Sequence, residues 1–459
     1  MLGNSIKKIT LSLFGLIENH KQKAILVSLF VIGLLSGLYF SKFRIEGDAQ
    51  YYYNSANLIK QNFLNLLNNR NIGITESLNA IFQGILFLLP GNDIWAVYVF
   101  QVCMFAFSGL IIFKTALFYL PRNWSILVVI YFGLNYKTWH MIYSFKPDIW
   151  CVFFVAWCFY IIIRTSKEPT KIRNWIIAGI SFGLMVLLDM RYIPYLFLLF
   201  CFLMFNIKPL SKVLLKLWII PLFAILTIAP WLIRQYFVFN KVILISELKT
   251  LMVSKALNTS YYNQVIEKKQ LIAGLTEDDA FKVGSKIGLS PSEVIFIRER
   301  LLIDSAQNKE WRYKHYDQYI KSGVLSMSQI ERMIDREELK PGWIKRVEYG
   351  LSMWLPLNLK YHYMPLTVFR EIAPPYSLLN NINRIVFIGI LLPFYLIGFL
   401  FACRSREWSL IFIAIILIVH TAVHSFTYVD QRYLLPVLSL FTLTSFYGIY
   451  NSLKELRII

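Results

Sequence analysis

The sequence predicts an all-α membrane protein that crosses the bilayer many times. Of its 459 residues, 57% are hydrophobic and 16% are aromatic, and the mean hydropathy is +0.52. Apolar runs of about 17–25 residues, the length that crosses ~30 Å of hydrocarbon, recur along the chain. The 47 lysines and arginines lie in short clusters between these runs, which is the positive-inside pattern of membrane proteins and does not indicate a nucleic-acid partner.

Ten spans account for the apolar runs, so we expect a bundle of about ten transmembrane helices with amphipathic juxtamembrane helices. Residues 76–90 are not counted as a span, because Gln83 interrupts the run and Pro90 ends it. An interfacial or re-entrant helix suits so short a run better. The predicted spans are 24–40, 94–118, 125–143, 149–164, 175–188, 192–206, 214–233, 384–402, 407–424 and 433–450.

The apolar stretch 176–205 is divided into two of these spans. One helix of that length would measure ~45 Å, too long for a single crossing. Asp189 and Arg191 lie in its middle, and a charge at the bilayer centre costs about 2.5–3.5 kcal/mol on insertion scales. A tight hairpin at 189–192 would move both charges to the water interface.

The charges also predict the orientation in the membrane. With the N-terminus inside, the basic clusters at 164–173, 208–216 and 404–406 face the cytoplasm. We therefore expect a multi-pass protein of the plasma (inner) membrane, with both termini cytoplasmic and one site facing outward. The residues that gather on the outer face in this arrangement are Asp48, His140, Lys146, Asp148, Asp189, Arg191, Arg234, His420, His424, Asp430 and Arg432.

Three regions follow from this threading. Residues 1–234 form an N-terminal transmembrane module, whose first outer loop is 41–93. Residues 235–383 are polar and carry several helix-start signals, such as Ser290-Pro291-Ser292-Glu293, so we expect an extracytoplasmic, mainly helical insertion. Residues 384–459 form the C-terminal transmembrane helices.

The first outer loop contains the stretch RIEGDAQYYYNSANLI, from Arg44 to Ile59. After Asp48, residues with apolar or aromatic side chains recur at helical spacing, which predicts an amphipathic helix on the membrane surface. Asp48 stands at its start, where it is either a helix cap, a catalytic carboxylate or both. The residues of the apolar face are Tyr52, Ala56, Ile59, Phe63 and Leu66.

Several motifs, in this order, resemble GT-C superfamily glycosyltransferases. They are the pattern G-D-x-x-x-Y-x-x-x-A from Gly47 and the stretches ESLNAIFQGILFLLPGND, SFKPDIWCVFF, APWLIRQYFVFNKVILIS, PGWIKRVEYGLSMWLP and VDQRYLLPVLSLF. The chain is most similar to the branch of dolichyl-phosphate-mannose–protein mannosyltransferases and bacterial lipid A aminoarabinose transferases. Many members of that branch have Asp-Glu where this chain has Asp48-Ala49, so a divalent metal is left open.

The resemblance implies transfer of a sugar from a polyprenyl-phosphate donor to an extracytoplasmic glycan, lipid or protein acceptor, with membrane lipids as further partners. It implies that Asp48 is the catalytic base and that Asp148 orients a substrate or shares the base role. The alternative for Asp148 is a solvated residue after Pro147. The donor phosphate is expected to bind Arg432, Arg191, Arg234 and Lys146, for which the alternative is interfacial snorkelling. Tyr52, Tyr433 and His424 are expected to contact substrate.

Other functions remain open from the sequence. A transporter or flippase for lipid-linked saccharides is expected to show internal repeats and charges at the bilayer midplane. A polymerase or ligase differs in using a lipid-linked oligosaccharide as donor. His420 and His424 share a helix face, but they have no evident third ligand, so no zinc site is predicted.

Overall fold

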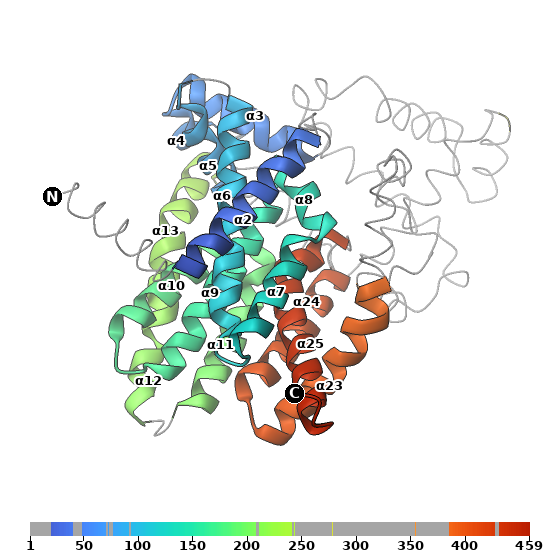
Figure 1. Cartoon of the computed structure of the whole chain (residues 1–459). Helices are drawn as coiled ribbons and strands as arrows, with labels where there is room; N and C mark the ends of the chain where they lie inside the picture. Colours follow the sequence, from blue (N-terminus) through green and yellow to red (C-terminus); the bar gives the residue numbers. More distant parts are fainter. Residues whose placement is uncertain are drawn as a thin grey trace. The chain divides into compact units, whose positions relative to one another are not determined.

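The computed structural model describes residues 20–39, 48–69, 72, 77–90, 93–207, 211–240, 243, 278, 354, 385–426 and 431–459. Every regular element in these ranges is a helix (Figure 1). The chain divides into two compact units, of which the first holds Met1–Leu251, Ser352–His424 and Val429–Ile459. The second, Met252–Leu351 with Ser425–Tyr428, lies almost wholly outside the described residues. The predicted helical insertion at 235–383 falls largely in the undescribed part and stays a prediction.

The helices of the first unit follow one another closely along the chain, with short connections. The N-terminal series is α2 (His20–Tyr39), α3 (Asp48–Gln61), α4 (Asn65–Asn68), α5 (Ser77–Phe87), α6 (Asp93–Ala116), α7 (Arg122–Gly133), α8 (Tyr136–Ile142), α9 (Asp148–Lys167), α10 (Ile172–Leu188), the 3₁₀ turn η2 (Met190–Tyr192), α11 (Ile193–Asn206), α12 (Ser211–Leu217) and α13 (Ile219–Phe239). The C-terminal series is the π-helical turn η5 (Phe387–Leu391), α23 (Leu392–Ser405), α24 (Trp408–Phe426), the 3₁₀ turn η6 (Gln431–Leu434) and α25 (Leu435–Glu455).

Five of these helices are long and apolar enough to cross a membrane by length and composition. They are Ile94–Ala116, Asp148–Lys167, Val213–Phe239, Phe387–Ser405 and Trp408–Ser425. The apolar helices over Gln22–Ser36, Ile172–Leu188 and Met190–Asn206 are shorter, so the total of ten spans stays a prediction.

Two expectations about helix ends have different outcomes. The break at 189–192 is confirmed, because α10 ends at Leu188 and α11 begins at Ile193. The span predicted over 125–143 is not one continuous helix, because α7 ends at Gly133 and α8 begins only at Tyr136. The break exposes the carbonyl of Gly133, which accepts a hydrogen bond from Trp139 Nε1 at 2.6 Å.

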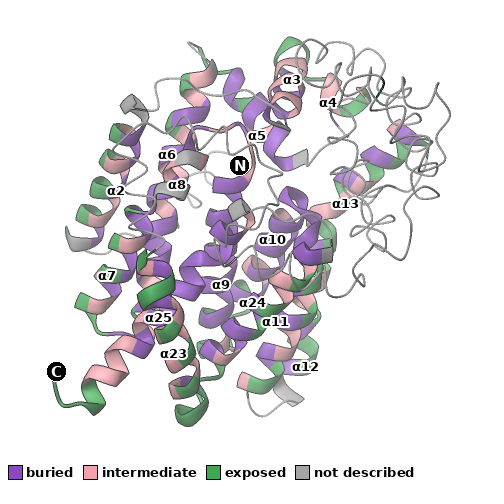
Figure 2. Ribbon diagram, turned by 90° about the vertical axis from the view of Figure 1, so that its right-hand side faces the viewer, coloured by how far each residue is buried: buried purple, intermediate pink, exposed green. Residues whose placement is uncertain are grey.

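Helix α9 is the central element of the bundle. Most of its side chains are buried (Figure 2), among them Trp150 and Ile162. It packs against α6, α10, α11 and α25. A helix that is apolar all round requires either a protein core or lipid around it, and α9 has the protein core.

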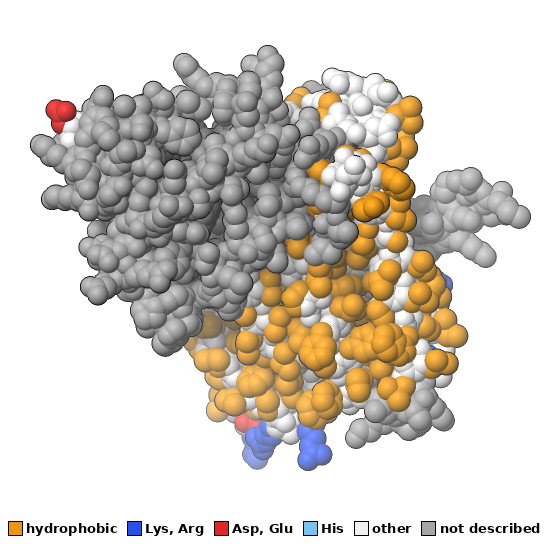
Figure 3. Space-filling model, turned by 180° about the vertical axis from the view of Figure 1, so that it is seen from behind, with side chains coloured by type: hydrophobic (Ala, Val, Ile, Leu, Met, Phe, Trp, Pro, Cys, Tyr) orange, Lys and Arg blue, Asp and Glu red, His pale blue; other side chains and the backbone are white. Residues whose placement is uncertain are grey.

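Helices α13 and α23 have the opposite surroundings. Large apolar side chains on them are exposed, such as Phe237 on α13 and Leu400 on α23. Figure 3 shows hydrophobic side chains over most of the coloured surface on one face of the molecule, with lysines and arginines at its lower edge. An exposed apolar surface of this extent is typical of contact with lipid.

The bundle has two ends with different residues. The α3 end consists of α3, α4, α5, the loop 143–147, η2 and η6. The C-terminal end consists of the connections 117–121, 168–171 and 406–407 and the residues after Glu455.

At the C-terminal end Glu168 lies 3.2 Å from Arg164 Nε and 3.1 Å from Lys171 Nζ. The hydrogen bond from Lys171, followed by that from Asn174, holds the pKa of the Glu168 carboxyl below its usual range.

Helices α23 and α25 cross very closely at two glycines. A Cβ added to Gly398 would collide with the carbonyl oxygen of Thr444, and one added to Gly448 would collide with the carbonyl oxygen of Phe394. Small residues at such a crossing allow two membrane helices to bring their backbones together.

We expect Gly398→Ala to lower the stability by about 1–3 kcal/mol, because backbone atoms of α25 must move to admit the methyl group. The measurement is the thermal unfolding midpoint of the purified protein in detergent. Gly389→Ala is the matched control, because a Cβ there meets no atom within 4 Å. Equal midpoints for the two variants would contradict the close crossing.

Candidate functional site

The loop before Asp148 is held by side-chain amides from two neighbouring helices. The carbonyl of Phe145 accepts hydrogen bonds from Asn79 Nδ2 at 3.0 Å and from Gln83 Nε2 at 2.8 Å. Gln101 Nε2 of α6 donates to the carbonyl of Ser144 at 3.0 Å. Gln83 interrupts an apolar run in the sequence. Its role is to donate a hydrogen bond to the carbonyl of Phe145, since buried backbone carbonyls need donors.

A small apolar cluster joins the start of α3 to the same loop. Tyr53 packs edge-on against the rings of Phe87 and Phe145, with centroid distances of 5.7 and 5.3 Å. Ala49 is buried in the cluster directly after Asp48, and Phe145 lies three residues before Asp148. The cluster thus brings the two candidate carboxylate positions to one region of the α3 end. Its buried members are Ala49, Ala56, Leu86, Phe87, Val97 and Phe145.

The predicted α3 is confirmed in position, with its first residue at Asp48. The buried face contains Tyr52, Ala56 and Ile59, as the helical spacing predicts. Phe63, the next residue of the expected face, is exposed because the helix ends at Gln61. The side chain of Asp48 lies outside the described residues, so its role stays a prediction.

Asp148 is the first residue of α9 and is buried, with 5% of its surface exposed. The solvated alternative considered for this residue is therefore wrong. Cys151, one turn further along α9, lies within the electrostatic influence of both Asp148 and Asp189. Asp148 thus belongs to the same charged neighbourhood as the turn between α10 and α11, while Lys146 is half-buried in the loop beside it.

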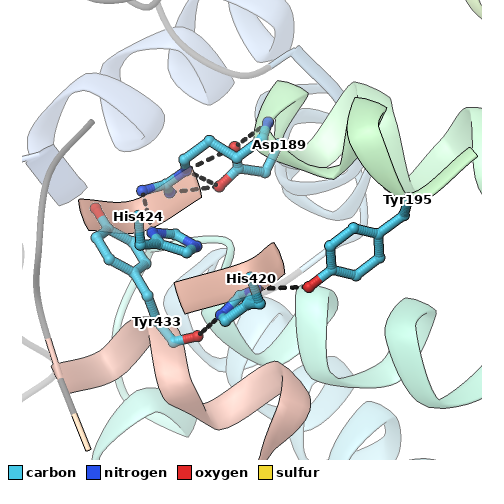
Figure 4. A network of polar contacts seen from close by, with 6 residues as sticks. Asp189, Tyr195, His420, His424 and Tyr433 are labelled. Carbon is cyan, nitrogen blue, oxygen red and sulfur yellow. Dashed lines mark hydrogen bonds and ion pairs between the residues drawn. The ribbon is translucent and has the colours of Figure 1, made fainter. Parts of the chain in front are cut away.

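Asp189 and Arg191 form a buried ion pair at that turn (Figure 4). Arg191 Nε donates to both carboxylate oxygens of Asp189 at 2.9 Å, and Nη2 donates to Oδ2. The backbone N–H of Arg191 donates to Oδ1 at 3.0 Å. Each side chain is only 7% exposed. The two charges thus compensate each other inside the protein, and their position at the water interface of the membrane stays a prediction.

Arg191 also connects this turn to the last two helices. Its Nη1 lies 3.2 Å from His424 Nδ1, and its guanidinium carbon lies 3.8 Å from the centroid of the Tyr433 ring. The His424 ring stacks on Tyr433 at 4.6 Å. Because arginine only donates hydrogen bonds, His424 Nδ1 accepts here, which assigns the proton of the neutral ring to Nε2.

His420 extends the network by one helical turn of α24. Its Nε2 lies 2.7 Å from the carbonyl oxygen of Tyr433, and its Nδ1 lies 2.6 Å from the hydroxyl of Tyr195. A carbonyl only accepts, so Nε2 carries the proton and the hydroxyl donates to Nδ1. Within the described residues no three His, Cys, Asp or Glu side chains are placed to hold a metal ion. In this structure His420 and His424 make hydrogen bonds to other residues of the network.

Arg234 lies in a different set of contacts. Its Nε donates to the carbonyl of Leu66 at 2.9 Å, Nη2 donates to the carbonyl of Asn69, and Nη1 donates to Gln235 Oε1. These contacts attach α13 to the segment around α4. Arg432 lies in η6 next to Tyr433, but its side chain is outside the described residues.

Some residues of the site carry no recognisable signal in the sequence. Tyr195 lies within an apolar helix, where a tyrosine is unremarkable, and only its partner His420 reveals its role. Asn79 and Gln83 do carry a signal, because polar residues four apart share one face of a helix.

We expect Asp189→Leu to destabilise the protein by about 3–5 kcal/mol, because it leaves the charge of Arg191 buried without its carboxylate. The double variant Asp189→Leu/Arg191→Met should recover most of this loss, since apolar replacements of a buried pair are often neutral. Both are measured by thermal unfolding in detergent. The control is Glu168→Gln, which breaks two solvent-accessible ion pairs, each worth at most about 1 kcal/mol. A loss no larger than that of the control would show that the pair is not buried as described.

Residues 78–233 match the model of the dolichyl-phosphate-mannose-protein mannosyltransferase family. No curated protein matches the chain. Two similar solved structures are of the oligosaccharyltransferase AglB from Archaeoglobus fulgidus. The first, in complex with an inhibitory peptide and a dolichol-phosphate, has a TM-score of 0.50 and 13% identity over 96% of this chain and 51% of that chain.

The second is the apo form of the Archaeoglobus fulgidus oligosaccharyltransferase, with a TM-score of 0.52 and 12% identity over 96% of this chain and 52% of that chain. The chain thus spans about half the length of the solved structures that it matches. At this identity the likeness establishes the fold. The family-model match and the fold together confirm the resemblance to GT-C membrane glycosyltransferases that the sequence motifs indicated.

Proposed function

We propose that this protein is a membrane glycosyltransferase that moves a sugar from a polyprenyl-phosphate-linked donor to an extracytoplasmic glycan, lipid or protein acceptor. The observation that carries the proposal is the convergence of polar residues at the α3 end of an apolar, GT-C-type bundle. These residues come from α9, the α10–α11 turn, α24 and η6, and they are Asp148, Asp189, Arg191, His420, His424 and Tyr433. A lipid-linked donor presents its sugar at the membrane surface, where the proposed threading puts this end.

The leaving phosphate needs cationic partners, because it departs with negative charge. Arg432, beside Tyr433, and Lys146, two residues before Asp148, are the first candidates. Arg191 and Arg234 are further candidates. Their guanidinium groups are engaged by Asp189 and by backbone carbonyls, respectively. Each must exchange a partner before it binds phosphate.

In the proposed reaction Asp48 removes the proton from the acceptor hydroxyl. The oxygen of that hydroxyl forms the new bond to the anomeric carbon of the sugar, while the bond from this carbon to the phosphate oxygen breaks. The electron pair leaves with the phosphate, and a nearby carboxylate stabilises the oxocarbenium-like transition state. Asp148 orients a substrate or shares the base role, and Tyr52, Tyr433 and His424 contact the substrates.

The position of the ionisable groups favours an enzyme over a transporter. In the proposed threading Asp189, Arg191 and Asp148 lie at the outer ends of membrane spans, whereas transporters place such groups midway across the membrane. A second candidate is transfer of a lipid-linked oligosaccharide, which the fold match to an oligosaccharyltransferase favours. The test is to incubate the purified protein with a polyprenyl-phosphate monosaccharide or with a polyprenyl-linked oligosaccharide, and to measure glycosylated product for each.

The proposed orientation has its own test. Cysteines introduced at positions 170 and 455 should resist a membrane-impermeant thiol reagent in intact cells, and one at position 310 should react. The background should carry Cys403→Ser, because Cys403 is exposed. Labelling of position 170 from outside would overturn the topology and the outward-facing site with it.

We expect Asp48→Asn to lower the rate of transfer by about 10²–10⁴-fold with the protein still folded, because asparagine caps a helix about as well as aspartate but cannot accept the proton. Asp93→Asn is the matched control, since Asp93 also begins a helix at the α3 end. Near-normal transfer by the Asp48 variant would move the base to Asp148.

We expect Arg432→Ala to raise the donor KM while the melting temperature stays within a few degrees. Arg432→Lys should recover donor use only in part, because an ammonium cannot reproduce the planar guanidinium fork. Arg406→Ala, at the C-terminal end, is the control. An unchanged donor KM for Arg432→Ala would remove this residue from the phosphate site.

A further inference from the structure

We propose that the groove between the ends of α23 and α25 binds the headgroup of an anionic phospholipid. The groove lies at the C-terminal end of the bundle, has a volume of about 490 Å³ and is lined from both helices. The candidate glycosyl-transfer site lies at the α3 end, so this inference goes beyond the proposed function and does not depend on it. The lining residues used below are Phe401, Arg404, Ser405, Tyr447, Asn451, Lys454 and Glu455.

The groove follows from the close crossing of the two helices. α23 and α25 touch backbone to backbone at Gly398 and Gly448. Beyond this contact, toward the C-terminal end, side chains separate the helices. The hydroxyl groups of Ser405 and Tyr447 meet at 3.2 Å across the gap, and Asn451 follows one turn later. Ser405 donates to the carbonyl of Phe401, and one N–H of Asn451 donates to the carbonyl of Tyr447. The second N–H of the Asn451 amide is left to donate to a phosphate oxygen.

The charge at the mouth of the groove is positive. Arg404 Nη1 lies 2.8 Å from Glu455 Oε1, and its side chain is 78% exposed. Lys454 has no ion-pair partner in the part of the chain that the structure describes, so its charge is available. Arg406 and Arg457 are exposed close by in the sequence. A phosphate at this position would therefore meet an excess of positive charge, as in basic pockets between membrane helices that bind anionic headgroups.

The surface of α23 continues the groove in a direction that suits acyl chains. Leu396 and Leu400 are 57% and 65% exposed, and Phe401 reaches the groove itself. A headgroup held by Arg404 and Lys454 would place its hydrocarbon chains against this apolar surface. The combination of an apolar wall with a basic mouth indicates a lipid in preference to a soluble phosphate.

The experiment compares two double variants that remove the same charge from the same end. Arg404→Gln/Lys454→Gln alters the groove. Arg164→Gln/Lys171→Gln alters the α9–α10 connection, where an arginine and a lysine both pair with Glu168. The protein is placed in nanodiscs of phosphatidylcholine with phosphatidylglycerol as the probe, and phosphatidylglycerol retained after release is measured by native mass spectrometry. The groove variant should bind about 10–30-fold more weakly, at ~1 kcal/mol per basic residue, while the control retains the lipid.

Three further outcomes decide the proposal. Equal losses of lipid in the two double variants would overturn it, because lipid retention would then be a general property of a basic membrane surface. No loss in either variant would also overturn it, because Arg404 and Lys454 would then not hold the lipid. Ser405→Phe, which fills the groove and keeps every charge, should also release the lipid. Glycerol phosphate in solution should not displace it, and displacement would overturn the assignment to a lipid. If the double variant does not fold, Lys454→Gln alone replaces it, and this single variant should also bind the lipid more weakly than the control.

Discussion

The ion pair between Asp189 and Arg191 is the interaction on which the α3 end of the bundle depends. Both groups lie between two apolar helices, where an uncompensated charge would cost several kcal/mol. The carboxylate accepts hydrogen bonds from two guanidinium nitrogens and from the backbone of Arg191. The break between α10 and α11 is therefore not a solvated turn. It is a folded polar centre that the surrounding helices must enclose.

The end of α24 and the turn η6 supply the side chains that enclose this ion pair. Arg191 has donors left over after Asp189, and they meet His424 and the Tyr433 ring. His420 then holds the carbonyl of Tyr433, which is a backbone group of η6. Residues more than two hundred positions apart are thus connected in one network. The position of η6, which contains the proposed phosphate-binding Arg432, therefore depends on the turn between α10 and α11.

The sequence predicts those features that depend on apolar periodicity and on charges within apolar runs. It predicts the break at 189–192, the start of α3 at Asp48 and the short helix α5, because each follows from residues that are neighbours in the sequence. It does not predict that Asp189 and Arg191 are buried, because their partners His424 and Tyr433 lie far away in the chain. It also does not predict the break after Gly133. Trp139 donates a hydrogen bond to the free carbonyl of Gly133, but a tryptophan in an apolar run does not indicate such a role.

The two ends of the bundle satisfy their polar groups in opposite ways, and this difference bears on function. At the α3 end, buried amides of Asn79, Gln83 and Gln101 hold the loop that leads to Asp148. These hydrogen bonds fix the backbone directly before Asp148. At the C-terminal end, Arg404 is exposed and Glu168 is half-buried, and their ion pairs are weak because solvent reaches them. Catalysis of group transfer requires preorganised groups, which only the α3 end provides. Exposed charges suit the binding of headgroups at a membrane surface, which is the role proposed for the other end.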